Sequence, residues 1–384
     1  MIIRDFSRIS DRDVAKQCWA RLRRFQNVTY VADFIQELHR PPANQVQNIK
    51  KQAQQIRACL SQAEEYFNAA RVVSISTKPL LLYYCVMSLS LAEILLKQDG
   101  GSSLDKARGQ NAHHGLTLSV QNKYVTSNSL SDSAGALSCR PLIHANGGRF
   151  GTFELWHKSS REMPIGGKRV VYFDTGRQET VCASVFLGRD ARMRLMQPAG
   201  VSLLECFESI PAMSDFLQSH KIRSKFARST IEQNIISTQQ HETIEIRIHP
   251  DPHTDISGVL DQFLFEPSSV NHIDAVEVSG GYLIKWEISA AFPQFKFTLP
   301  NAFQLKSDQV YFCSQNESLN EFGLYYVSLY ILGNFARYYP DMWMSSVENS
   351  TPLALAALEF LSSAEERVPL LALSELSRTL FLVD

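Results

Sequence analysis

The sequence predicts an α+β fold, in which N- and C-terminal helices form one helical bundle and a β-rich mixed insert lies between them. Three observations support this prediction: an apolar segment at 77–101, a second one at 320–340, and β-like runs between about 119 and 310. A helix that is apolar on nearly all sides must be covered, so the two apolar helices are expected to share a core. The chain is therefore divided into a helical part (1–118), an insert (119–310) and C-terminal helices (311–384) that pack on the first part.

Composition narrows the class of protein. The chain has 384 residues, of which 45% are hydrophobic and 20% charged, as in ordinary soluble globular proteins. A net charge of -1 gives no global reason to expect nucleic acid or an anionic membrane as a partner. The 7 cysteines include no CxxC pair, which argues against a disulfide framework and a cysteine-rich zinc site. The charged N-terminus lacks an apolar signal region, so a cytoplasmic protein is expected.

The N-terminal part predicts four helices. Residues 13–26 form an amphipathic pattern, and a short helix is expected at 30–38, before Pro41 and Pro42. From 46 to 70 apolar residues recur in alternating steps of three and four, which predicts a long helix with a coiled-coil-like seam. The apolar helix at 79–98 begins with a proline and ends at two glycines.

These last two helices are expected to form an antiparallel hairpin, because a short connection joins them. Dimerisation through the seam at 46–70 is the alternative, so a homo-oligomer stays open. The helix at 79–96 is just long enough to raise the question of a membrane span. Glu93, two serines and the lack of a second such segment favour a core helix and no membrane.

The insert contains β-like runs and one helical interruption. Clean alternation at 243–248 predicts a half-buried antiparallel strand. The other expected strands lie at 169–173, 180–187, 275–278 and 282–288, with a hairpin turn at 279–281. A helix is expected at 202–220, broken at Pro211, and the glycine-rich residues 147–151 are expected to form a turn into a strand at 152–155.

The C-terminal part predicts three helices. The apolar helix from 320 should close at Pro340, and two shorter helices are expected at 352–363 and 369–382. Each of these two begins with a proline, which suits a first helical turn.

Short motifs along the helical ends resemble a known family. The motifs are Ala70-Arg71, Pro79-Leu80-Leu81, Tyr83-Tyr84, Leu91-Ala92, His114-Gly115-Leu116, Leu332-Gly333, Ala336-Arg337-Tyr338-Tyr339-Pro340 and Trp343. With them the chain resembles the YaaC-like family of uncharacterised bacterial proteins, and its helical part resembles HEPN-type domains. The resemblance implies a HEPN-like bundle and a non-catalytic interaction or sensing role in bacterial stress response or antiphage defence. A protein partner is expected on the same ground.

The HEPN resemblance also implies an alternative, a metal-independent ribonuclease. Ribonucleases of that type place an arginine shortly before a histidine, so that a cation and a general acid or base meet at one phosphodiester. Arg108 precedes His113 and His114 at a fitting spacing, although in a polar loop and not on a late helix. These three residues are the catalytic candidates, and loop ordering is the competing interpretation.

Two further sets of residues are binding candidates. Arg337 ends an apolar helix and is followed by Tyr338 and Trp343, so it either stacks on these aromatic rings or binds an anionic ligand. The second set is a basic patch in the insert that either tracks a phosphate backbone or is a solvated face. Its members are Arg192, Arg194, Lys221, Arg223, Lys225 and Arg228.

No metal or cofactor is expected. The turn at 249–255 carries metal-ligating residue types, but no third distant ligand is identified for it. The glycine-rich residues 147–151 lack the Lys-Ser/Thr of a P-loop. Three functional hypotheses remain, namely the interaction or sensing component, the ribonuclease, and a nucleic-acid-binding module that uses the basic patch.

Overall fold

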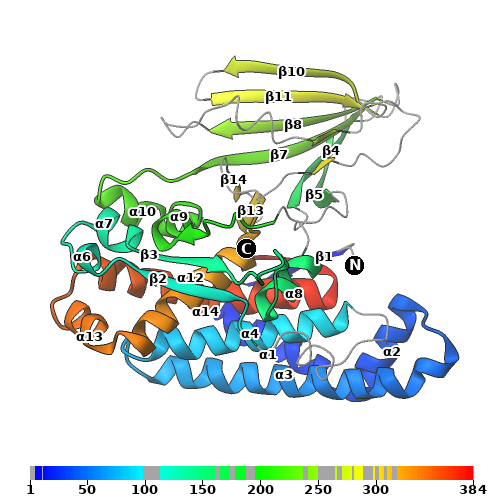
Figure 1. Cartoon of the computed structure of the whole chain (residues 1–384). Helices are drawn as coiled ribbons and strands as arrows, with labels where there is room; N and C mark the ends of the chain where they lie inside the picture. The colour runs from blue at the N-terminus through cyan, green and yellow to red at the C-terminus, as the bar shows by residue number, and fades with distance from the viewer. Residues whose placement is uncertain are drawn as a thin grey trace.

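The computed structural model describes residues 5–10, 12–97, 113–160, 165–172, 178–186, 195–236, 241–249, 264–265, 270–278, 281–288, 297–298, 302–306, 309–313 and 318–383. Figure 1 shows three layers: long helices on one side, a small sheet with short helices above them, and a large sheet on the far side. Both helical ends of the chain lie in the first layer. The fold is therefore α+β, as predicted.

Two long antiparallel helices, α3 (Val46–Val72) and α4 (Lys78–Leu96), form the base of the helical layer (Figure 1). Except for Val46 at its first position, the residues of α3 that form the predicted seam are buried, including Ile49, Ile56 and Leu60. The hairpin prediction is confirmed, and its apolar seam faces a partner within the same chain. Gln52 closes the far end of the pair by donating its side-chain N–H to the Leu95 carbonyl.

Helix α4 is long and apolar enough to cross a membrane, but 72% of that window is buried inside the protein. It is covered by α3, by α12 (Glu321–Tyr338) and by α14 (Pro352–Ser377). Such coverage is what a core helix of a soluble protein has, and a lipid-facing helix would lack it.

The C-terminal part differs from prediction in two places. Pro340 does not simply close a helix, because a further helix, α13 (Pro340–Glu348), begins there. Residues 352–377 form one helix with Pro369 inside it, where two helices were predicted. An internal proline removes one backbone hydrogen bond. Burial of Val368, Leu370 and Leu371 beside it compensates for that loss and carries the helix through.

The residues after α14 form strand β15 (Thr379–Val383), which pairs in parallel with β1 (Asp5–Ile9). Neither strand was predicted, since each is short and gains its partner from the opposite end of the chain. Between β1 and α3 lie α1 (Val14–Leu22), the 3-10 helix η1 (Arg23–Gln26), α2 (Val28–His39) and the 3-10 helix η2 (Ala43–Gln45). Helix α1 packs on α14, so the two ends of the chain are joined twice.

The middle layer is built around a three-stranded antiparallel sheet in the order β2-β3-β6. Its elements are β2 (Leu116–Val120), α6 (Asn122–Val125), α7 (Leu130–Gly135), β3 (Leu137–Pro141), α8 (Thr152–Ser159), β6 (Val201–Ser202), α9 (Leu203–Glu208), η3 (Pro211–Met213) and α10 (Ser214–Ser219). The predicted break at Pro211 is confirmed. The predicted strand at 152–155 is wrong, because these residues begin helix α8, whose Phe153 and Trp156 face the core one turn apart.

The far layer is an eight-stranded sheet. Six strands follow the order β10-β11-β8-β7-β14-β13, and β4 joins at β7 with β5 outside it. The bounds are β4 (Ile165–Tyr172), β5 (Gln178–Phe186), β7 (Phe226–Ile236), β8 (His241–His249), β10 (Val270–Val278), β11 (Gly281–Ile288), β13 (Ala302–Lys306) and β14 (Gln309–Cys313). Two further short strands, β9 (Leu264–Phe265) and β12 (Phe297–Thr298), pair with each other. All five strands predicted in the insert are present, and among the described strand pairs of this sheet only β4–β7 is parallel.

Candidate functional site

One face of α12 organises a cluster of aromatic and basic side chains. Tyr326, Tyr330 and Arg337 are four and seven residues apart, so they follow one side of the helix. Tyr83 of α4 packs edge-on against the first two, with ring centroids 6.1 Å from Tyr326 and 5.4 Å from Tyr330. The two apolar helices predicted from the sequence therefore bring their tyrosines together.

Gly333 allows this close approach of α12 and α4. A Cβ at Gly333 would lie 3.1 Å from the Pro79 carbonyl oxygen and 3.2 Å from the Tyr83 Cβ. The missing side chain lets the two backbones meet at the first turn of α4. This contact sets how far Arg337, one turn later, lies from Tyr84.

His114 enters the cluster from the segment before β2. Its Nδ1 is 2.9 Å from the Tyr83 hydroxyl oxygen, and the ring centroids are 5.5 Å apart. The His114 ring is half-buried. Burial, followed by the electrostatic effects of Arg337 and His113, lowers the pKa of His114 below its ordinary 6.5. At neutral pH His114 is thus a neutral imidazole beside a permanent cation.

Backbone contacts hold His114 in place. The Tyr330 hydroxyl donates to the Leu116 carbonyl at 2.7 Å, and the Phe153 amide donates to the His114 carbonyl at 2.9 Å. A Cβ built on Gly151 would lie only 2.2 Å from the Gly115 Cα, so the two glycines allow the chain segments to touch. The histidine is therefore fixed by α12, α8 and β2 together.

Arg337 presents a cation at the surface beside His114. Its Nη1 donates to the Tyr84 hydroxyl at 3.0 Å, and its guanidinium lies 5.1 Å from the centroid of the Tyr338 ring. Tyr84 is itself stacked on Tyr66 of α3, 5.4 Å away. Among the described residues, no carboxylate forms an ion pair with Arg337. A guanidinium has five N–H donors in a planar fork, so most of them remain available to a ligand.

His113 faces a different neighbour, although it precedes His114 directly. Its ring is exposed and lies 5.4 Å from the Phe150 centroid, nearly perpendicular to it. Phe150 belongs to the hairpin at 142–150, and His144 of the same hairpin stacks on it at 3.7 Å. The sequence singled out both histidines, and the structure gives them separate surroundings.

The other candidates predicted from the sequence fall into three groups: residues outside the described part, residues near the end of α12, and the basic patch of the insert. Arg108, Arg192 and Arg194 lie outside the described residues. Trp343 is 1% exposed and donates its indole N–H to the Ser76 carbonyl, so it packs in the core near the end of α12. Tyr338, the residue after Arg337, is 61% exposed.

The basic patch of the insert is spread over a loop and the start of a strand. Lys221 and Arg223 are exposed between α10 and β7, whereas Lys225 is paired with Glu208 at 2.7 Å. Arg228 lies within β7, opposite His249 of β8. Strand β7 begins only at Phe226, so Lys221, Arg223 and Lys225 precede it.

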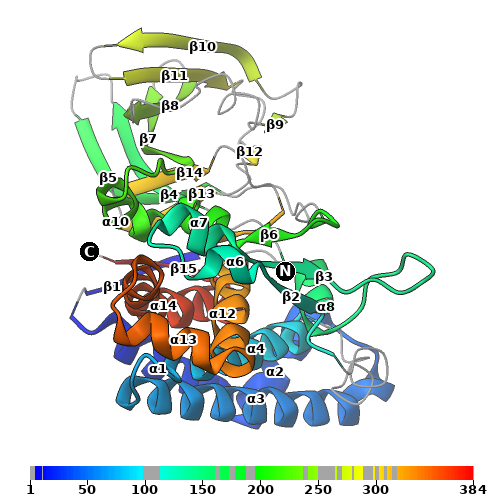
Figure 2. The ribbon, with the colours of Figure 1, turned by 60° about the vertical axis from the view of Figure 1, so that its left-hand side comes forward.

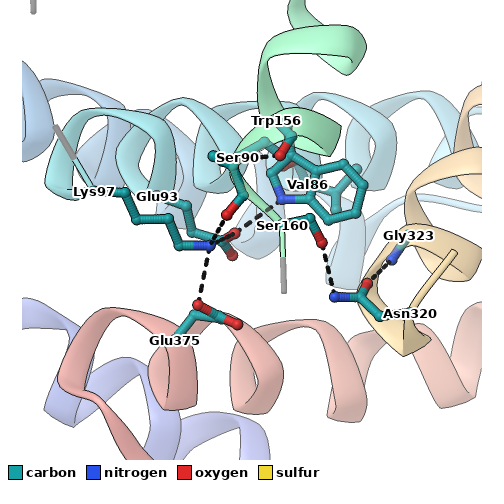
Figure 3. Close-up of polar contacts among 10 residues, drawn as sticks. Val86, Ser90, Glu93, Lys97, Trp156, Ser160, Asn320, Gly323 and Glu375 are labelled. Atoms are coloured by element: carbon teal, nitrogen blue, oxygen red, sulfur yellow. Dashed lines mark hydrogen bonds and ion pairs between the residues drawn. The ribbon is translucent and has the colours of Figure 1, made fainter. Parts of the chain in front are cut away.

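A second polar cluster lies inside the helical layer (Figure 3). Lys97 is 3.0 Å from a Glu375 carboxylate oxygen and 3.9 Å from Glu93, and Trp156 donates its indole N–H to Glu93 at 2.9 Å. Burial raises the pKa of Glu93 to about 8, against the lowering effect of Lys97. When Glu93 is protonated and therefore neutral, the positive charge of Lys97 is balanced by the one negative charge of Glu375. The cluster joins α4, α8 and α14 inside the protein and is a structural feature.

The described residues contain no group of three or more His, Cys, Asp or Glu side chains arranged to hold a metal ion. Residues 250–255, in the turn that carries metal-ligating residue types, lie outside the described part. The site of Tyr83, Tyr84, His114 and Arg337, hereafter the Arg337–His114 site, is therefore the candidate functional site.

Sequence reasoning did not join these four residues. It paired His114 with Arg108 by spacing and treated Arg337 separately. A signal was nevertheless present, because Tyr83-Tyr84, His114 and Arg337 all belong to the short motifs that carry the family resemblance.

Comparison with known proteins identifies a family. The family model of YaaC-like proteins matches residues 23–133 and 185–376, which is most of the chain. No curated protein and no solved structure matches the chain. The matched segments include the four residues of the Arg337–His114 site.

Proposed function

This chain belongs to the YaaC-like protein family, and we propose that it is a non-catalytic sensing or interaction component that binds an anionic ligand at the Arg337–His114 site. The observation that carries the proposal is Arg337 itself. This exposed guanidinium is held by the Tyr84 hydroxyl and forms no ion pair with a described carboxylate. Charged side chains that are held in place and left unpaired at the surface suit recognition of carboxylate or phosphate.

His114 adds a neutral hydrogen-bonding group to this cation. Its Nδ1 is occupied by Tyr83, so its Nε2 edge is the part that can face a ligand. A neutral imidazole with one nitrogen occupied offers one further hydrogen bond, whose direction follows from the tautomer. The site therefore favours an oxyanion that accepts from Arg337 and contacts His114 at the same time.

The proposal also covers the cellular role of the protein. We place the protein in bacterial stress response or antiphage defence, with a protein partner, because short sequence motifs of its helical part resemble those of HEPN-type domains. We place it in the cytoplasm because its cysteines are scattered and include no CxxC pair. Phage plating on cells that produce the wild-type protein or Arg337→Ala tests this role. Protection that is lost in the variant supports it, and plaque counts that do not change with either protein contradict it.

Calorimetric titration with inorganic pyrophosphate at low salt tests the binding. We expect Arg337→Ala to weaken binding at least about tenfold, since a charge-assisted hydrogen bond is lost. Arg57→Ala is the matched control, because Arg57 is an exposed arginine on another helix, α3, and does not belong to the Arg337–His114 site. Wild-type protein that does not bind, or equal binding by Arg337→Ala, would refute the proposal.

A ribonuclease is the second candidate, and one observation favours it. A neutral His114 beside Arg337 provides a proton acceptor and a cation, the two groups that metal-independent phosphodiester cleavage needs. In this alternative Arg337 takes the place that spacing gave to Arg108. Incubation with labelled RNA separates the two functions, because only a ribonuclease yields shorter products that disappear in His114→Ala.

A further inference from the structure

We infer that Tyr83 holds His114 in the tautomer that carries its proton on Nε2, so that His114 donates this N–H to an oxygen of the ligand. This inference rests on the proposed function and narrows the ligand class. The ligand is an ionised phosphate or carboxylate whose oxygens accept hydrogen bonds from both Arg337 and His114. Tyr83 is then a positioning residue, because it decides what the imidazole offers to the ligand.

Three side chains from neighbouring elements interact at the Tyr83 hydroxyl. Tyr83 lies on α4, Tyr326 lies on α12, and His114 precedes β2, and these elements lie side by side in Figure 2. His114 Nδ1 is 2.9 Å from the Tyr83 hydroxyl oxygen, which is a hydrogen-bond distance. Tyr83 and Tyr326 pack edge-on, and both are buried, so their hydroxyls depend on partners inside the protein.

Both tyrosines keep their hydroxyl protons at neutral pH. Burial raises the pKa of Tyr83 and the pKa of Tyr326 above the ordinary 10. For Tyr326, the contact with the Tyr83 hydroxyl opposes this effect of burial, so the two hydroxyls interact. Among the described residues, no other hydrogen-bond partner is found for the Tyr326 hydroxyl. The neighbouring Tyr330 is satisfied separately, since it donates to the Leu116 carbonyl.

The number of protons determines the tautomer. One link joins His114 Nδ1 to the Tyr83 oxygen, and a second joins the Tyr83 and Tyr326 oxygens. With the imidazole proton on Nε2, Tyr326 donates to Tyr83 and Tyr83 donates to Nδ1, so every proton has an acceptor. With the proton on Nδ1, three protons compete for the same two links, and one buried hydroxyl has no acceptor. Because an unpaired buried donor is costly, the Nε2–H tautomer is favoured by about fivefold or more.

This tautomer limits the ligands that the site accepts. No described residue forms a hydrogen bond with His114 Nε2, so this N–H is left for the ligand. Tyr83 and Tyr84 connect it to the second donor, because their ring centroids are 5.6 Å apart and Tyr84 accepts from Arg337. His114 and Arg337 thus offer donors alone, which suits an oxyanion. An Nε2 that already carries a proton cannot take one from a ribose hydroxyl, so the tautomer also opposes the ribonuclease alternative.

Nuclear magnetic resonance reads the tautomer without any ligand. Protein with ¹⁵N-labelled histidine is measured at neutral pH, and the His114 signals are those missing from His114→Ala. Long-range proton–nitrogen correlation shows which ring nitrogen carries the proton. We expect the proton on Nε2, and a proton on Nδ1 would overturn the inference.

Two variants that keep the buried rings test the role of Tyr83. Tyr83→Phe removes the donor to Nδ1, so both His114 nitrogen signals should shift and the Nδ1–H tautomer should gain population. Tyr326→Phe is the matched control and should keep the Nε2–H tautomer, because Tyr83 still needs Nδ1 as its acceptor. Unchanged His114 signals in Tyr83→Phe, or a proton that moves to Nδ1 in Tyr326→Phe, would contradict the inference.

Calorimetric titration with inorganic pyrophosphate, and with malonate in parallel, tests the donation to the ligand. His114→Gln places a side-chain amide near the position of Nε2, whereas the shorter amide of His114→Asn reaches only the position of Nδ1. An amide N–H donates, but an amide is not a base. We expect His114→Ala and His114→Asn to weaken binding about tenfold and His114→Gln to stay within about threefold of wild type.

The outcomes separate this inference from the proposed function. The anion that wild type binds more tightly shows whether the ligand is a phosphate or a carboxylate, and the order of the variants must hold for that anion. If His114→Gln binds it as weakly as His114→Ala, donation by Nε2–H is refuted while anion binding stands. If wild type binds neither anion, the proposed function fails and donation to a ligand fails with it, whereas the resonance spectra still decide the tautomer.

Discussion

Replacement of Gly333 by alanine tests the helix contact that supports the site. The added Cβ would lie 3.1 Å from the Pro79 oxygen, 3.2 Å from the Leu80 Cα and 3.2 Å from the Tyr83 Cβ. Two of these three atoms belong to the backbone of α4 and cannot rotate away. Overpacking of this kind costs about 1–3 kcal/mol, and the better helix propensity of alanine returns about 1 kcal/mol. We expect a net loss of up to about 2 kcal/mol in the free energy of unfolding.

Gly135→Ala is the matched control for this substitution. A Cβ at Gly135 would meet only the Leu204 Cδ2, at 4.0 Å, so alanine fits there without displacing a neighbour. Its helix propensity should then raise stability, by at most about 1 kcal/mol. Urea unfolding followed by far-UV circular dichroism compares the midpoints at unchanged slope. The reasoning is refuted if Gly333→Ala unfolds at the same or a higher urea concentration than wild type while Gly135→Ala behaves as expected.

Three other predictions concern charged groups. Arg367 forms a bidentate pair with Glu321 at 2.7 Å inside the helical layer. Arg367→Met leaves the Glu321 carboxylate buried and unpaired, so it should lower the free energy of unfolding by about 3–5 kcal/mol, measured by urea unfolding. Adding Glu321→Leu removes that charge and should restore most of the loss. Because the pKa of Glu93 rises from 4.5 to about 8 on folding, the folded protein holds a proton that the unfolded chain releases. Wild-type stability should therefore fall as pH rises through this window, and Glu93→Gln should flatten the fall in pH-dependent denaturation. Arg337 lowers the pKa of His114, so in Arg337→Ala the His114 ring should titrate at higher pH by NMR, and an unchanged midpoint would place the two groups further apart than the structure does.

Much of the helical layer could be predicted because its signals are local. The seam of α3, the apolar length of α4 and the proline in its first turn are each visible within one segment. The parallel pair β1–β15 was missed for the opposite reason, since it joins residues 5–9 to 379–383 and neither strand is stable without the other. Pro369 misled the prediction because tertiary packing overrode its local effect.

The candidate site could be predicted only as separate residues. His113, His114 and Arg337 were identified by residue type, but no spacing in the sequence joins residue 114 to residues 83 and 337. The connection depends on Gly333, which sets the approach of two helices, and on the meeting of Gly115 and Gly151. Two other binding candidates from the sequence have structural surroundings instead. Trp343 packs in the core, and Lys225 is paired with Glu208.

One measurement tests the main claim, that Arg337 and His114 form a binding site without catalysis. Labelled total RNA is incubated with wild type, Arg337→Ala, His114→Ala and the control Arg57→Ala, and retention and cleavage are read from the same samples. The account predicts RNA at full length in every sample, and any retention should weaken with salt, fall in Arg337→Ala and stay in Arg57→Ala. RNA that is cleaved by wild type and intact with His114→Ala would contradict it, and so would retention that Arg337→Ala leaves unchanged.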